Sequence, residues 1–198
     1  NAIKHYYLGD QEALKAKMEL MQEEFAKTQK PDETSLRAKE LLPVGNAFLI
    51  KAADMIRKKT DRAGIFEFIN KMMIERLFAD GGVILTIGEF EDVLSVKAYS
   101  GNYPPPYKLP DDVPHKQDRV VTNFKYAEFL LNNSFFGEAA RSAAPILIQN
   151  AQKDSRIIVN GEEPFLLPGS LLTLPMIYHD NVEGIISLSR NADHDPFT

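Results

Sequence analysis

The chain has 198 residues, of which 44% are hydrophobic and 26% charged, so it can bury a substantial core and is not a disordered segment. Its net charge of -5 and its pI near 5.4 argue against a nucleic-acid partner, because phosphate binding needs a clustered basic face. The chain has no cysteine, which excludes disulfides, thiolate metal sites and cysteine nucleophiles.

Residues 1–59 are expected to form a helical segment. The apolar residues of its first helix alternate four and three positions apart, as in a coiled-coil seam: Leu14, Met18, Met21 and Phe25. The seam covers only about two heptads, so the pattern fits an intersubunit helix and also a helix packed on its own domain. We expect Pro43 and Gly45 to break or kink a later helix, because proline removes a donor and clashes with the preceding turn.

The next part of the chain changes from helical to strand-like patterns. Apolar residues at Phe66, Ile69, Met73 and Leu77 predict a mostly buried helix that ends at Asp80-Gly81-Gly82. Two β-rich runs then predict a hairpin, and these runs are residues 83–87 and 93–99.

The middle of the chain is the least regular part. Residues 101–114 are rich in proline and predict an extended loop. We expect a short strand at Val120-Val121-Thr122, a helix from Tyr126 to Leu131 and a second short helix from Phe135 to Ala144. Pro145 stops that helix, and Ile146-Leu147-Ile148 predicts a short buried strand.

The last part predicts a second hairpin, formed by residues 171–178 and 182–189. Pro175 costs a ladder bond, so the edge of its strand should be free or bulged at this point. Gly184 indicates a bulge or a close approach of backbone or ligand. Helices and antiparallel hairpins in this order predict an α+β fold, an antiparallel sheet with helices on its faces behind an N-terminal helical segment.

Four passages resemble the GAF domain family, in the family's order. They are Phe66 to Gly81, Gly137 to Ala151, Ser170 to Met176 and Tyr178 to Leu188, and the resemblance runs from about Arg62 to Thr198. It implies a small-molecule pocket between the sheet and the loops above it, dimerisation through flanking helices, and an output domain elsewhere in the protein. Residues 101–134, where such domains form their lid, depart from the usual shorter pattern.

Candidate ligand-binding residues lie on the strands, loops and short helices that would border this pocket. They are Tyr99, Phe124, Phe129, Phe136, Arg141, Asn150, Thr173 and Met176. The aromatic residues could equally fill the core beneath a long lid. Arg141 could bind an anionic ligand or pair with Glu138 three residues before it.

We find no catalytic signature. The histidines His5, His115, His179 and His194 are far apart, so no metal site is expected, and no nucleophile-elbow pattern surrounds Ser170. The sulfoxide-reducing members of the resembled family use cysteines, which this chain lacks.

The hypothesis from the sequence is a non-catalytic GAF-like sensor domain at residues 60–198 behind a signalling segment at residues 1–59. It would bind a small molecule, form a homodimer through the N-terminal helices and signal to an output domain outside this chain, without a cofactor. We expect it in the cytoplasm, because no apolar run approaches the ~20 residues that cross a bilayer and the start has no signal-peptide pattern. The alternatives are a dimerisation scaffold with a self-filled pocket and, with little support, a small enzyme.

Overall fold

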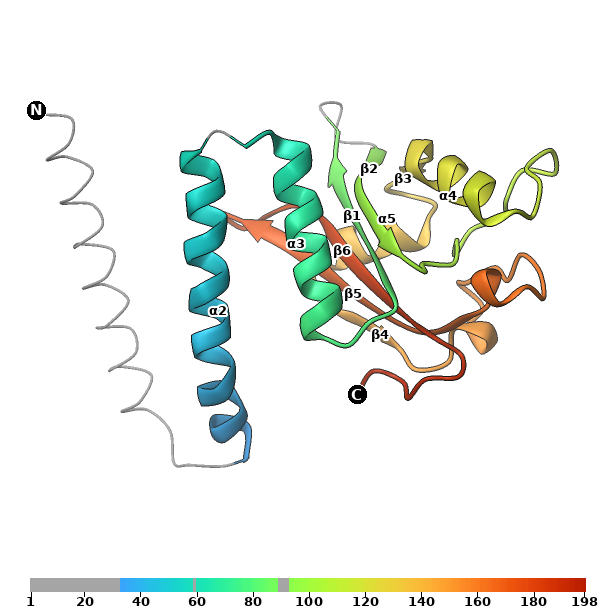
Figure 1. The fold of residues 1–198 in the computed structure, drawn as a ribbon. Helices are drawn as coiled ribbons and strands as arrows, with labels where there is room; N and C mark the ends of the chain where they lie inside the picture. Colours follow the sequence, from blue (N-terminus) through green and yellow to red (C-terminus); the bar gives the residue numbers. More distant parts are fainter. Residues whose placement is uncertain (1–32, 59, 89–92) are drawn as a thin grey trace, which may run out of the picture. The chain divides into compact units, whose positions relative to one another are not determined.

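The computed structural model describes residues 33–58, 60–88 and 93–198 (Figure 1). The predicted seam from Leu14 to Phe25 lies outside the described residues and stays a prediction. The chain divides into two compact units, residues 1–54 and 55–198. Among the helices of the described residues, none combines the length and the apolarity that a membrane span requires.

Helix α2 spans Glu33–Arg57 as one helix of 25 residues. Of the two outcomes expected at Pro43 and Gly45, a break or a kink, the break is therefore wrong. A proline inside a helix removes one backbone hydrogen bond, and the flanking residues, rich in good helix formers such as leucine, alanine and lysine, continue the helix on both sides.

A six-stranded antiparallel sheet with the strand order β3-β2-β1-β6-β5-β4 forms the centre of the second unit. The strands are β1 (Gly81–Ile87), β2 (Val93–Gly101), β3 (Glu128–Leu130), β4 (Ile146–Ile148), β5 (Pro168–Tyr178) and β6 (Asn181–Asn191). Both predicted hairpins, β1–β2 and β5–β6, are confirmed, and with them the α+β architecture.

Two strand positions behave as their residue types require. Strand β4 pairs with β5 only from Leu171 to Thr173, so Pro175 lies beyond its end, where the missing N–H costs no ladder bond. Gly184 on β6 lies against β1, and a Cβ atom there would come within 2.2 Å of the Leu85 carbonyl oxygen. The expected free edge and close backbone approach are both confirmed.

Helix α3 (Arg62–Arg76) covers one face of the sheet. The Asp61 carboxylate caps its start by accepting a hydrogen bond from the Gly64 N–H. Asn70 is fully buried and donates to the Gly82 carbonyl at 2.8 Å. Since side chains alternate along a strand, Gly82 lies on the face toward α3 and Val83 on the opposite face.

Two short helices lie over that opposite face, α4 (Gln117–Tyr126) and α5 (Phe135–Ser142), and two 3-10 turns, η1 (Ala151–Lys153) and η2 (Pro164–Leu166), follow. The predicted strand at residues 120–122 is wrong, because Val120 and Phe124, four apart, bury one face of α4 in the core. The predicted helix at residues 126–131 is also wrong, because β3 pairs there with β2. The helix predicted from Phe135 is confirmed as α5.

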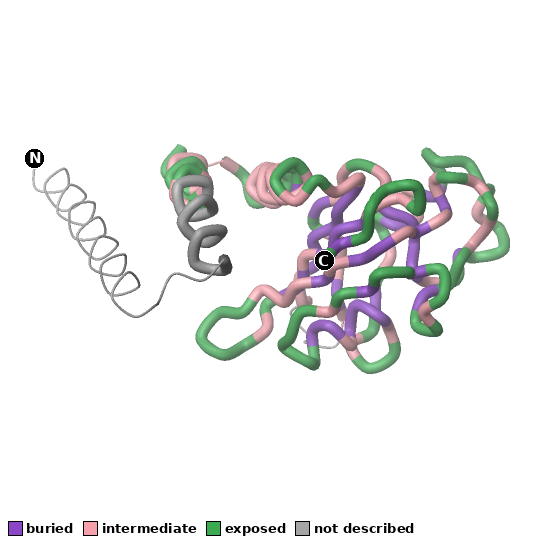
Figure 2. Tube along the Cα trace, turned by 90° about the horizontal axis from the view of Figure 1, so that it is seen from below, coloured by how far each residue is buried: buried purple, intermediate pink, exposed green. Residues whose placement is uncertain are grey.

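The main core fills the space between the sheet and these short helices. Its buried residues come from all six strands, from α4, α5 and η1, from the loop after β2 and from the segment between η1 and η2. Figure 2 shows this distribution, with buried segments concentrated in the strands and exposed ones in the outer loops. The ligand pocket was predicted on the face of the sheet opposite α3, and this face carries the main core.

Candidate functional site

Seven aromatic side chains form a continuous cluster above the sheet. The aromatic cluster consists of Tyr99, Tyr103, Tyr107, Phe124, Phe129, Phe135 and Phe136. Its ring pairs have centroid distances from 4.8 to 6.4 Å, the range of favourable edge-to-face and tilted contacts. Phe124 is fully buried and touches five of the other rings, so it is the centre of the cluster.

Beneath the rings, three buried hydroxyl groups satisfy one another. The Ser187 Oγ atom lies 2.6 Å from the Tyr103 hydroxyl and 2.6 Å from the Thr173 Oγ1 atom. Tyr99 donates its hydroxyl proton to the Tyr103 carbonyl at 3.0 Å. These polar groups already have partners inside the protein, so a ligand could reach them only by breaking the existing hydrogen bonds.

The tyrosines of the cluster stay protonated at physiological pH. Burial raises the pKa of Tyr99 to about 12, and burial also raises the pKa of Tyr103 and of Tyr107. Their hydroxyls therefore act as neutral hydrogen-bonding groups, and they are unsuited to act as bases. The space above the sheet is an apolar interior with an internal hydroxyl chain.

A cleft of about 350 Å³ opens at the margin of the cluster, beside edge strand β3. Its apolar walls come from Tyr107, Phe129, Leu130, Phe135 and Ile158, and the remaining lining residues are Pro106, Ala127, Glu128, Asn133, Ser134, Phe136 and Arg156. This size and this mixture of apolar walls with a few polar groups match small-molecule sites.

The guanidinium group at one side of the cleft is held by two carboxylates. Arg156 donates to both oxygens of Asp154, at 2.9 and 2.7 Å, and to Glu138 at 2.9 Å. The hydrogen bonds from Arg156 lower the pKa of Asp154 to about 2, and the carboxylates raise the pKa of Arg156. Asp154 is therefore ionised at neutral pH, and its charge balances the single positive charge of Arg156, which also binds Glu138.

The aromatic candidates from the sequence lie together, but only two of them reach the cleft. Phe129 and Phe136 line it. Tyr99 and Phe124 lie deeper in the aromatic cluster, as the core-filling interpretation anticipated.

The other candidates are dispersed. Thr173 belongs to the buried hydroxyl chain, and Asn150 is exposed at the start of η1. Arg141 is exposed on α5, and of its two alternatives the pairing with Glu138 does not form, because Arg156 binds that carboxylate. Met176 was expected to face the same pocket as Thr173. The strand pleat places these two residues, three apart, on opposite faces, and Met176 lies against Gly184 on the α3 side.

Sequence reasoning missed Arg156, Glu128 and Ser134. The spacing Asp154-Ser155-Arg156 is a local signal for the ion pair, since the Arg156 N–H also bonds the Asp154 carboxylate as in an Asx turn. Ser134 before Phe135 is an N-cap signal, and its hydroxyl accepts from the Gly137 N–H. Nothing local predicts that Glu128 lines the cleft. Within the described part of the chain, no three His, Asp or Glu side chains converge as a metal site requires.

No protein-family model and no curated protein matches the chain. Solved structures do resemble it. The GAF domain of a phosphoenolpyruvate-protein phosphotransferase from Acinetobacter has a TM-score of 0.53 and 15% identity, with 75% of this chain and 78% of that chain covered. The GAF domain of the corresponding Coxiella burnetii protein gives 0.53 and 14%, with coverage of 77% and 80%.

An enzyme shares this fold as well. A free methionine-R-sulfoxide reductase from Neisseria meningitidis, solved in complex with its substrate, has a TM-score of 0.51 and 12% identity, with 84% of this chain and 81% of that chain covered. Similarity at this level concerns the fold, and the fold alone does not separate regulatory domains from enzymes. Residues 62–198 of this chain, with their antiparallel sheet and covering helices, have the fold of a GAF domain.

Proposed function

We propose that the chain is a non-catalytic regulatory domain that binds a small molecule in the cleft beside β3. The observation that carries this proposal is the contrast between the two spaces over the sheet. The aromatic cluster closes the interior, while the adjoining cleft of about 350 Å³ stays open and joins apolar walls to a few polar groups. A guest in the cleft would touch Phe129 and Phe136 and so contact the cluster directly.

The charges around the cleft favour a neutral or cationic guest. Arg156 uses its donors on Asp154 and Glu138, so an anionic guest would have to compete with two carboxylates already in place. Glu128 supplies a carboxylate to the lining itself. An apolar molecule with an amine or hydroxyl group fits this environment better than an organic acid.

The rival function is a dimerisation scaffold without a ligand. The closed aromatic cluster favours it, because a self-filled space above the sheet is what that hypothesis expects. In either case we propose a homodimer formed through the N-terminal helices, a signal passed to an output domain outside this chain, and a location in the cytoplasm.

A non-catalytic role is supported by the chemistry of the cleft. Its ionisable lining groups are Glu128, Arg156 and Tyr107. Arg156 is committed to ion pairs, and burial raises the pKa of Tyr107, so neither is suited to exchange protons near neutral pH. Because an enzyme shares the fold, this part of the proposal needs its own test: incubation with methionine sulfoxide and a reductant, in which formation of methionine would contradict it.

A matched ligand series tests the binding proposal. We would measure melting temperatures with benzylamine, benzyl alcohol and benzoate, which share one ring and differ in charge. A compound at ten times its Kd stabilises a domain by about 1.4 kcal/mol, a rise of roughly 3–5 °C. We expect rises with the amine and the alcohol and little or none with benzoate.

Two tryptophan variants locate the binding. Ile158→Trp fills the cleft wall and should abolish the rise, while Ile177→Trp, at a similarly exposed isoleucine on β5, should preserve it. An equal rise in both variants would refute binding in the cleft. No rise with these compounds, or with a wider set of nucleotides and amino acids, would favour the scaffold.

A further inference from the structure

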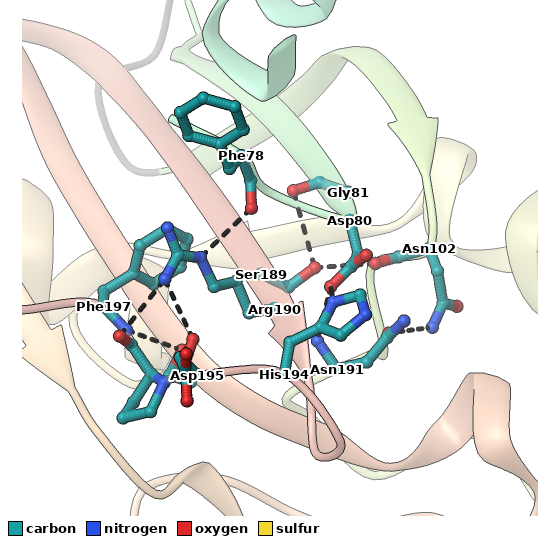
Figure 3. Close-up of polar contacts among 12 residues, drawn as sticks. Phe78, Asp80, Gly81, Asn102, Ser189, Arg190, Asn191, His194, Asp195 and Phe197 are labelled. Atoms are coloured by element: carbon teal, nitrogen blue, oxygen red, sulfur yellow. Dashed lines mark hydrogen bonds and ion pairs between the residues drawn. The ribbon is translucent and has the colours of Figure 1, made fainter. Parts of the chain in front are cut away.

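The last residues of the chain are fastened to the start of the sheet and to the end of α3. The contacts gather around two side chains, Arg190 at the end of β6 and Asp80 in the turn between α3 and β1 (Figure 3). They lie on the second unit and do not involve the cleft beside β3.

Arg190 binds four backbone carbonyl oxygens from two separate segments. It donates to Leu77 at 2.9 Å and Phe78 at 3.1 Å, where the carbonyls at the end of α3 favour a cation. The same guanidinium donates to Asp195 at 2.9 Å and Pro196 at 3.2 Å, and it lies 4.4 Å from the centre of the Phe197 ring. One side chain thus joins the helix end to residues 195–197.

The backbone at the helix end is held in an uncommon conformation. Phe78 has a φ of 51°, in the left-handed region, although its side chain is 82% exposed. Its carbonyl is one of the groups that Arg190 binds. The hydrogen bond to Arg190 therefore helps to hold a backbone conformation that phenylalanine seldom adopts.

Asp80 makes the second fastening. One oxygen of its carboxylate accepts a hydrogen bond from the Asn191 N–H at 2.8 Å and lies 2.7 Å from His194 Nδ1. The charged groups that act on His194 are Asp80, its neighbour Asp193 and Arg190. Asp80 dominates and, with Asp193, raises the pKa of His194 above 6.5, whereas Arg190 opposes the rise.

Phe197 anchors the far end of the segment. Its ring is 5% exposed, and its backbone N–H donates to the buried Ser170 hydroxyl at 3.1 Å. Phe197 therefore fixes the end of the segment to β5. Between β6 and Phe197, the segment is held by Asp80 and Arg190.

We propose that Asp80 and Arg190 form a latch that fastens residues 192–198 to the carboxyl end of α3, and that loss of the proton from His194 loosens it. With the latch closed, a displacement of α3 against the sheet is passed to the segment leaving β6. Because the pKa of His194 is raised, its attraction to Asp80 is complete below pH 6.5 and is lost as the pH rises through the raised value. The latch is a conformational device separate from any ligand in the cleft.

Hydrogen–deuterium exchange of the whole chain at pH 6 and pH 8, with labelling times scaled to the intrinsic exchange rates, tests the latch. We expect the protection of residues 192–198 to be about two- to fivefold lower at pH 8, the range for an exposed ion pair. His194→Asn should remove this difference. His179→Asn, at an exposed histidine in the β5–β6 turn, should retain it.

Arg190→Lys separates the latch from a general loss of structure. Lysine keeps the charge but cannot present planar donors to four carbonyls, so residues 192–198 and the last turn of α3 should lose protection together at both pH values. Strand β1 should stay protected, which shows that the variant is folded. The proposal is overturned if the wild-type protection is the same at both pH values, if His194→Asn keeps the difference, or if Arg190→Lys leaves both segments unchanged.

Discussion

The aromatic cluster makes a strong prediction about Phe124. Its side chain is fully buried, and its ring contacts those of Tyr99, Tyr103, Tyr107, Phe129 and Phe136. Phe124→Ala removes a ring from the centre of a packed cluster, where the surrounding rings belong to different elements and cannot all close the gap. We therefore expect a loss of about 3–5 kcal/mol in the free energy of unfolding, a fall in melting temperature of roughly 10 °C or more.

Urea unfolding at a constant m-value measures this loss. Phe78→Ala is the matched control, because the Phe78 side chain is 82% exposed and should change the free energy of unfolding by no more than about 0.5 kcal/mol. Benzene should then raise the melting temperature of Phe124→Ala by more than that of the wild type, since an apolar cavity binds such a guest. A cost below about 1 kcal/mol, or equal effects of benzene on both proteins, would refute the view that this ring closes the space over the sheet.

Three further predictions concern single sites. Ser187→Ala should lower the free energy of unfolding by about 1–3 kcal/mol, and by more than Tyr103→Phe, because it removes the partner of two buried hydroxyls. The reverse order in urea unfolding would contradict the hydroxyl chain. Gly184→Ala should lower the unfolding free energy by about 1–3 kcal/mol or more, since its Cβ would meet the Leu85 carbonyl at 2.2 Å. Gly45→Ala on α2, with open space around it, should not destabilise the protein. Equal effects of the two substitutions would be inconsistent with the pairing of β6 with β1. The lowered pKa of Asp154 contributes stability that is complete above pH 3.8 and is lost as the pH falls toward 2. Asp154→Asn should therefore reduce the change in unfolding free energy over this interval, measured by urea unfolding, by no more than about 1 kcal/mol. An unchanged pH dependence of the unfolding free energy would speak against the ion pair with Arg156.

Local patterns were sufficient to predict the two hairpins and the helices at their sides. The apolar, β-rich runs in β1, β2, β5 and β6 reflect strands that bury one or both faces, and that signal is present in the residues themselves. The same reasoning placed Pro175 at a free edge and Gly184 at a close approach, because both depend on backbone chemistry at one position.

Local sequence patterns gave wrong predictions for elements whose structure depends on contacts with residues distant in the sequence. Val120-Val121 suggested a strand, yet Val120, packed with Leu109 and Leu166, and Phe124, in the aromatic cluster, are both buried on helix α4. Strand β3 exists because residues 128–130 meet β2, and its own three residues carry little strand signal. Short elements are stabilised by tertiary contacts that their own sequence does not encode.

The candidate site was only partly predictable for the same reason. The aromatic residues were singled out by their density, but whether they surround a guest or one another depends on how α4, β3 and α5 pack. The bond between Tyr103 and Ser187 joins residues 84 positions apart, and the ion pair of Arg156 with Glu138 joins residues 18 apart. Each contact joins residues on different elements, so the period of a single helix or strand predicts neither of them.

The central claim is that a small molecule binds beside β3 and does not enter the space over the sheet. A titration with benzylamine, followed through backbone and methyl NMR chemical shifts, tests it directly. We predict shifts that saturate at Ala127, Leu130 and Ile158, with Leu171 and Thr173 unchanged. Saturating shifts at Leu171 and Thr173, with the cleft residues unmoved, would contradict the account.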